Sequence, residues 1–149
     1  SDVECTLPDV YWSGNISHQI WGRTPREILV DANWHGEGFE AVVFDESRRP
    51  LIAPRISHNT GRMGHMVFSP DGTRLLADSY PDGEGLQTLT LIDSASGEYE
   101  ELGRFRHQQP PGTAVDVRCD LHPRWSPDGR TVTVDSIHEG RRAVYLLEL

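Results

Sequence analysis

The feature of this sequence that most constrains the fold is an internal repeat. Residues 65–93 and 122–149 each begin with a histidine, continue to an aromatic residue and then read Ser-Pro-Asp-Gly. A weaker copy begins at His18, where Gly22-Arg23-Thr24-Pro25 stands in place of that tetrapeptide. Repeats of about 20–50 residues are the sequence signature of solenoids and propellers. We therefore expect copies of one structural unit packed side by side.

Each repeat has the pattern of a four-stranded meander. In residues 69–72 and 126–129 a proline fixes φ and a glycine permits positive φ, which predicts tight hairpin turns. Short runs typical of strands flank these turns, at 17–21, 27–32, 39–45 and 51–54 in the first copy and at 65–68, 74–77, 87–92 and 99–102 in the second. No segment has helical periodicity. The predicted fold class is all-β, with β-propeller blades that are four-stranded antiparallel meanders.

The repeats define a single domain over residues 1–149, a partial propeller. We expect blades at approximately 13–57, 61–106 and 115–149, with residues 1–12 as a possible closing strand. Propellers have about four to eight blades. The ring is therefore incomplete in this sequence, and either further blades or other copies of the chain complete it as a homo-oligomer. Trp12, Trp21, Trp34 and Trp125 are expected to fill the wedges between blades.

The charge narrows the range of partners. A formal net charge of −9 argues against nucleic acid and against an anionic membrane surface, because both require a basic face. The apolar runs are too short to span a bilayer. A local arginine cluster can still attract an acidic oligosaccharide at short range. We expect a soluble protein of the bacterial cytoplasm, the periplasm or the extracellular space.

Three histidines occupy the same repeat position: His18, His65 and His122. The first strand of each blade lines the central channel, so equivalent positions on successive blades gather on one ring. Imidazole is the commonest protein metal ligand. Cys119 would complete a tetrahedral zinc site, whereas Asp120 would give a harder site suited to manganese. The sequence thus predicts a divalent metal, Mn or Zn, although each histidine taken alone fits a structural role better than a metal-binding one.

Other residues have possible roles near these histidines. Arg118 is a candidate to bind a substrate carboxylate, with a plain surface ion pair as the alternative. Trp34 could stack on a sugar ring. Tyr80 could donate a proton to a leaving oxygen, with packing under the next blade as the alternative. A second repeat position holds Asp31, Asp78 and Asp135. These carboxylates are expected to bind the N–H groups of the adjoining turns.

The repeats resemble the TolB-like propeller repeat, whose marks are the aromatic residue before Ser-Pro-Asp-Gly and a hydrophobic strand ending in Asp-Ser. Residues 17–21, 64–81, 118–123 and 135–140 are similar to the C-terminal blades of oligogalacturonate-lyase-like proteins, and propeller ulvan lyases are similar to the same degree. This resemblance implies a divalent metal held by histidines of neighbouring blades, here His18, His65 and His122. It also implies β-elimination on a uronate, with a base removing the proton α to the carboxylate.

The sequence departs from that family in one stretch. Further metal ligands, a Gln and a His, are expected just upstream of His122, where this chain has residues 116–120 with Cys119 and Asp120. The arginine base implied by the resemblance would lie before residue 1. Two hypotheses therefore stand: a metal-binding lyase-like propeller acting on uronate-containing oligosaccharides, and a non-catalytic TolB-like propeller that binds a protein partner. A full ring would favour the enzyme.

Overall fold

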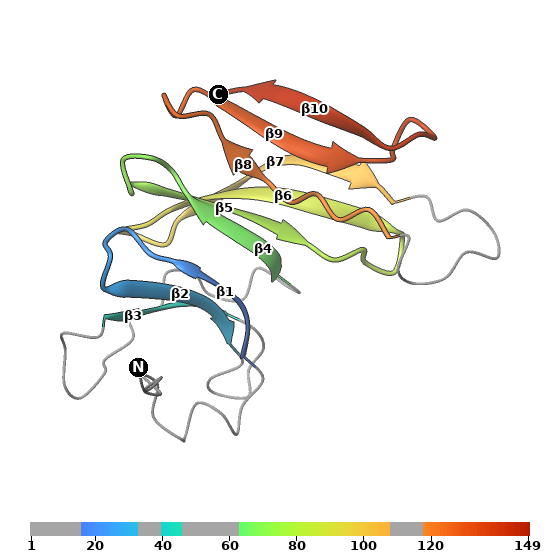
Figure 1. Ribbon diagram of the computed structural model, residues 1–149. Helices are drawn as coiled ribbons and strands as arrows, with labels where there is room; N and C mark the ends of the chain where they lie inside the picture. Colours follow the sequence, from blue (N-terminus) through green and yellow to red (C-terminus); the bar gives the residue numbers. More distant parts are fainter. Residues whose placement is uncertain (1–15, 33–39, 46–62, 108–117) are drawn as a thin grey trace, which may run out of the picture.

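The computed structural model describes residues 16–32, 40–45, 63–107 and 118–149. These residues form three antiparallel sheets and no helix (Figure 1). The first sheet contains β1 (Ile16–Trp21), β2 (Glu27–Ala32) and β3 (Glu40–Asp45). The second contains β4 (Met63–Phe68), β5 (Arg74–Ser79), β6 (Leu86–Asp93) and β7 (Tyr99–Arg106). The third contains β8 (Arg124–Trp125), β9 (Thr131–Ser136) and β10 (Ala143–Glu148).

The strand order within each sheet is the order along the chain, so each sheet is a meander. The second sheet has all four strands, β4-β5-β6-β7, which confirms the predicted blade. The predicted fourth strand of the first copy, at 51–54, and the possible closing strand at 1–12 lie outside the described residues. The all-β fold class is confirmed. No helix that could span a membrane occurs in the part of the chain that the structure describes.

The Ser-Pro-Asp-Gly turns connect the first two strands of the second and third sheets. The backbone N–H of Ser69 donates to the Arg74 carbonyl over 2.8 Å, and Gly72 takes a φ of 73°. Asp71 Oδ1 accepts hydrogen bonds from the Ser69 hydroxyl at 2.6 Å and from the Thr73 backbone at 3.0 Å. The third sheet repeats this arrangement at residues 126–129. The turn is stable because its own side chains satisfy its N–H groups.

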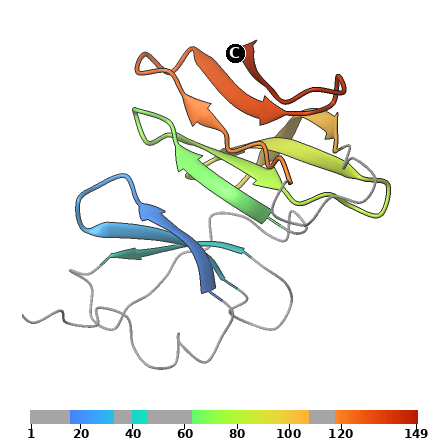
Figure 2. The ribbon, with the colours of Figure 1, turned by 45° about the vertical axis from the view of Figure 1, so that its right-hand side comes forward.

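Two hydrophobic clusters hold the three sheets together. Figures 1 and 2 show the sheets lying one beside the next in chain order. Between the first and second sheets the buried residues are Leu29, Ala41, Val43, Met66, Leu75, Ala77 and Ile92. Between the second and third they are Leu76, Leu89, Leu91, Leu121, Val132 and Val134. Burial of both faces of the second sheet is what a blade inside a propeller requires.

An arginine covers an aromatic ring at each junction between sheets. Arg74 of the second sheet lies 4.8 Å from the centre of the Trp125 ring and donates to the Gly129 carbonyl over 3.2 Å. Arg23 of the first sheet lies 5.8 Å from the Phe68 ring. Trp21 holds the same repeat position as these two rings but is 72% exposed. Trp21 therefore does not fill a wedge between two of the described sheets.

Candidate metal centre

The three repeat-equivalent histidines lie together where the first strands meet. The ring centroids of His65 and His122 are 3.8 Å apart, and those of His18 and His65 are 4.9 Å apart. The strands explain this convergence, because β4 contacts β1 on one side and β8 on the other. The fold thus brings three imidazoles from three sheets into one cluster.

Irregular backbone aims the histidines at this cluster. His18 and His122 have φ of 55° and 43°, in the left-handed region that few residues other than glycine adopt. The pairing register shifts between Ser17 and Ile20 in the first sheet, and between Met63 and Met66 in the second. Bulges of this kind redirect side chains and are common beside functional sites. The local strain is therefore concentrated at the histidine positions.

Asp78 connects two of the histidines. Its Oδ1 accepts the backbone N–H of His65 at 2.6 Å, and its Oδ2 accepts the backbone N–H of His122 at 2.9 Å. Oδ2 also lies 3.2 Å from His65 Nδ1. Gly64 provides the space, since a Cβ there would lie 2.4 Å from Asp78 Oδ1. We expected the Asp78 carboxylate to bind the N–H groups of a turn. Instead it bonds His65 and His122 and so connects the second and third sheets.

Asp120 completes a group suited to a cation. One ligand atom from each of His65, His122 and Asp120 lies within 4.8 Å of the others. Asp120 is buried and also forms an ion pair with Arg118, with Nε to Oδ1 at 2.7 Å and a hydrogen bond from the second guanidinium nitrogen to Oδ2 at 2.9 Å. The Gln87 amide, which is also buried, donates to Oδ1 over 3.4 Å. Two imidazoles and a carboxylate therefore face one another, with the carboxylate held by its neighbours.

His18 and Cys119 stand apart from this three-residue group. His18 Nε2 lies 3.1 Å from the Tyr80 hydroxyl, and its Nδ1 lies 3.7 Å from Asp31 Oδ2. Cys119 is a buried free thiol, and burial raises its pKa. A thiol with a raised pKa is a poor source of the thiolate that binds zinc. The histidine and aspartate set thus fits the harder type of site better than the cysteine set does.

Burial and neighbouring charges shift the pKa values of the titratable groups in and around the cluster in different directions. Burial lowers the pKa of His18, and the neighbouring His65 lowers it further. The hydrogen bond to Asp78 raises the pKa of His65, against the effect of burial. Burial also raises the pKa of Tyr80, so its phenol remains protonated at neutral pH. Burial raises the pKa of Asp31 to about 7.

The remaining candidates are partly placed. The Arg118 guanidinium stacks 4.5 Å from the Tyr80 ring while it pairs with Asp120, so it lies at the same end of the strands as the histidines. Trp34 lies outside the described residues. The sequence prediction misses Gln87, although its place in phase with Leu89 and Leu91 of β6, which are also buried, is a signal that could have marked it as buried.

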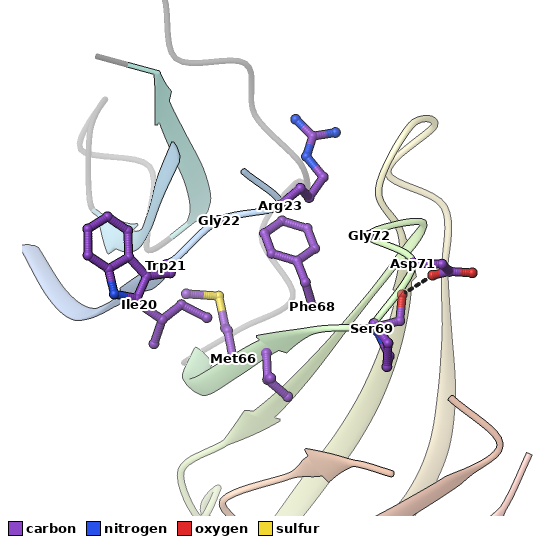
Figure 3. A pocket seen from close by; sticks show the side chains of 11 residues that line it. Ile20, Trp21, Gly22, Arg23, Met66, Phe68, Ser69, Asp71 and Gly72 are labelled. Atoms are coloured by element: carbon purple, nitrogen blue, oxygen red, sulfur yellow. Dashed lines mark hydrogen bonds between the residues drawn. The ribbon is translucent and has the colours of Figure 1, made fainter. Parts of the chain in front are cut away.

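A pocket of about 350 Å³ lies at the other end of β1 and β4. Figure 3 shows Ile20, Met66 and Phe68 gathered between the two strands, with Arg23 above the Phe68 ring. Arg23 forms an ion pair with Glu27 at 3.0 Å. The pocket thus lies between the first two sheets, and Arg23 beside it is already paired with Glu27. It is separate from the histidine cluster.

Comparisons with known proteins identify the fold. No family model matches the sequence, and no curated protein matches it. An oligogalacturonate lyase in complex with manganese matches with a TM-score of 0.71 and 19% identity, over 91% of this chain and 35% of that chain. TolB from Acinetobacter baumannii matches at 0.67 and 17%, over 91% and 30%. A putative TolB from Agrobacterium tumefaciens matches at 0.65 and 14%, over 91% and 43%.

These matches confirm the predicted TolB-like β-propeller relationship at the level of the fold. The chain spans less than half the length of each of the three propellers. Three sheets are also fewer than the roughly four to eight blades of a closed ring. The described sheets are therefore part of a propeller, and the same fold serves both TolB and a lyase.

Proposed function

We propose that this chain supplies the blades that bind a divalent cation in a lyase-like propeller, and that the complete propeller acts on uronate-containing oligosaccharides. The observation that supports this most is the grouping of His65, Asp120 and His122 within 4.8 Å. The propeller with manganese among the solved structures has a similar fold. Two imidazoles and one carboxylate are three protein ligands, the usual number in catalytic metal sites with an open position.

The donor set fits manganese or zinc. Carboxylate and imidazole ligands suit both ions, and the carboxylate favours manganese. Asp120 already binds Arg118, but a carboxylate has about four lone-pair positions and can bind a cation as well. When bound, the cation would neutralise the uronate carboxylate and make the proton α to it more acidic.

The residues around this site have complementary tasks in the proposed reaction. A guanidinium has five N–H donors, so Arg118 keeps donors for a substrate carboxylate while it binds Asp120. In β-elimination a base removes the α-proton, a carbon–carbon double bond forms and the glycosidic C–O bond breaks. Tyr80 is protonated at neutral pH and would give its proton to the leaving oxygen. His18 Nε2, 3.1 Å from that hydroxyl, would orient it.

The cation site can be tested on the chain itself. Mn²⁺ titrated into the purified chain should bind at one site, and both His65→Ala and His122→Ala should weaken that binding by at least roughly tenfold. His138→Ala is the matched control, because His138 contacts Ser136 and Tyr145 on the outer part of the third sheet. A wild-type chain that takes up no Mn²⁺, or a control that loses it equally, would overturn the proposal.

The lyase activity needs a separate test. The metal-loaded protein with its ring complete should release an unsaturated uronate from polygalacturonate or ulvan, seen as new ultraviolet absorbance. Tyr80→Phe should slow this release without preventing Mn²⁺ binding. Absence of the product from a metal-loaded, complete ring would rule out the lyase and leave the metal site standing.

A non-catalytic propeller that binds a protein partner is the second candidate. One observation favours it: the Arg118 guanidinium pairs with both carboxylate oxygens of Asp120, so the charge of Asp120 is balanced without any cation. Two of the similar structures are TolB proteins. In this case Mn²⁺ would not change the melting temperature of the chain, and Arg118→Met would lower it.

A further inference from the structure

We infer that Asp78 is the positioning residue of the candidate metal centre, and that it orients the imidazole of His65 and the backbone of His122 so that both histidines offer Nε2 to a cation. The inference rests on the proposed metal site. Asp78 lies on β5 and is only 2% exposed. Its carboxylate contacts His65 and His122, so its role would be exercised through these two histidines.

The first step concerns the proton on His65. An ionised carboxylate can only accept hydrogen bonds, and Asp78 Oδ2 lies 3.2 Å from His65 Nδ1. The proton of the neutral imidazole must therefore sit on Nδ1, which leaves the lone pair on Nε2. Hydrogen bonds of this type set the tautomer and ring orientation of metal-binding histidines.

The second step concerns His122, where a backbone carbonyl has the same effect on the ring. His122 Nδ1 lies 3.1 Å from the carbonyl oxygen of Asp120, which also can only accept. Asp78 acts here on the main chain, because its Oδ2 accepts the His122 N–H at 2.9 Å. That residue has the left-handed φ of 43°, which costs free energy unless surrounding contacts hold it. One carboxylate thus supports two ligands from two sheets.

The third step is a comparison with the other two aspartates at this repeat position. Asp135 Oδ2 lies 3.8 Å from Arg142. Asp31 Oδ2 lies 3.7 Å from His18 Nδ1, and its Oδ1 has no hydrogen-bond partner among the described residues. Among the described residues at this position, only Asp78 bonds two histidines. Asp31 and Asp78 each lie beside the histidine of their own repeat, but only the contacts of Asp78 extend to the histidine of the next repeat.

The experiment measures the histidine tautomers of the full chain without metal. At about pH 8.5, above the ordinary imidazole pKa of about 6.5, long-range ¹⁵N–¹H spectra should show His65 in the Nδ1–H form. Asp78→Asn should shift His65 toward the Nε2–H form and weaken Mn²⁺ binding roughly 10- to 100-fold. Asp135→Asn is the matched control and should change neither quantity.

The outcomes separate this inference from the proposed function. If His65 of the wild-type chain is in the Nε2–H form, the inference fails even if Asp78→Asn does not fold. It also fails if the variant folds and keeps both the tautomer and the Mn²⁺ affinity within about threefold. If the wild-type tautomer is Nδ1–H but the chain binds no Mn²⁺, the orienting role of Asp78 stands and the metal centre is wrong.

Discussion

The imidazole rings of His65 and His122 lie with their centroids 3.8 Å apart, tilted by 36°, although they belong to different sheets. Neither ring is fully buried. Nδ1 of His65 lies against the Asp78 carboxylate, and Nδ1 of His122 lies against the Asp120 carbonyl, so both rings meet a hydrogen-bond acceptor at that nitrogen. Their juxtaposition shows that the fold brings repeat-equivalent residues of neighbouring blades together.

The close approach of Gly64 to Asp78 gives a prediction about both stability and metal binding. Gly64→Ala would place a Cβ 2.4 Å from Asp78 Oδ1, so the carboxylate must move away from the histidines. We expect a loss of about 1–3 kcal/mol in the free energy of unfolding, measured by urea denaturation, and weaker Mn²⁺ binding. Gly83→Ala is the control, because a Cβ there meets nothing within 4 Å. Equal effects of the two substitutions would contradict the packing described here.

The junction between the second and third sheets gives a second prediction. Arg74→Met removes the cation over the Trp125 ring and the hydrogen bond to Gly129. A cation–π contact contributes about 0.5–1 kcal/mol and a hydrogen bond about 0.5–1.5 kcal/mol. We therefore expect a loss of about 1–2.5 kcal/mol in the free energy of unfolding.

Arg104 provides the comparison for this junction. It forms an exposed ion pair with Glu101 on β7, and exposed pairs contribute little. Arg104→Met should therefore cost clearly less stability than Arg74→Met. If the two arginine variants lose the same stability, the arginine over Trp125 does not hold the sheets together.

The buried carboxyl of Asp31 predicts how stability depends on pH. Burial raises its pKa from 3.8 to about 7. Between these values the folded protein keeps a proton that the unfolded chain has lost, so the free energy of unfolding falls as the pH rises toward 7. Asp31→Asn is neutral at every pH and should lack this decline. Urea denaturation at about pH 5 and about pH 8 should show the variant gaining relative to the wild type at the higher pH.

Asp128 should change the pH dependence of the free energy of unfolding in the opposite direction. Its hydrogen bonds, the largest effect being that of Ser126, lower its pKa, so it stabilises the fold above its ordinary pKa and loses that effect as the pH falls below about 4. Asp128→Asn should therefore flatten the dependence of the free energy of unfolding on pH only in the acid range.

For Asp31, the contradicting outcome is a pH profile of Asp31→Asn that runs parallel to that of the wild type. It would show that Asp31 does not titrate as described.

Much of the fold could be predicted from residues that act locally. Proline and glycine in residues 69–72 determine the hairpin wherever the sheet lies, and the strand expected at 27–32 coincides with β2. β7 extends to Arg106, beyond the expected end at 102. Its sequence is polar along most of its length, because the outer strand of a blade is exposed, so hydrophobic patterning could not reveal its end.

The site was predictable only in part, for a physical reason. Repeat equivalence predicts that His18, His65 and His122 lie on one ring. In the structure, the His65 ring lies beside both the His18 ring and the His122 ring. The contacts of Asp78 and Gln87 depend on how far one sheet is displaced against the next, and no local pattern in the sequence encodes that displacement. The left-handed backbone of His18 and His122 likewise follows from tertiary contacts, since neither residue has an intrinsic preference for it.

The claim that repeat-equivalent histidines form a metal site is tested most directly by pulsed electron paramagnetic resonance of Mn²⁺ bound to the full chain. With ¹⁵N-labelled histidine, the account predicts nuclear modulation from two directly bound imidazole nitrogens, reduced to one in His122→Ala. Bound Mn²⁺ without any coupling to histidine nitrogen would contradict the account.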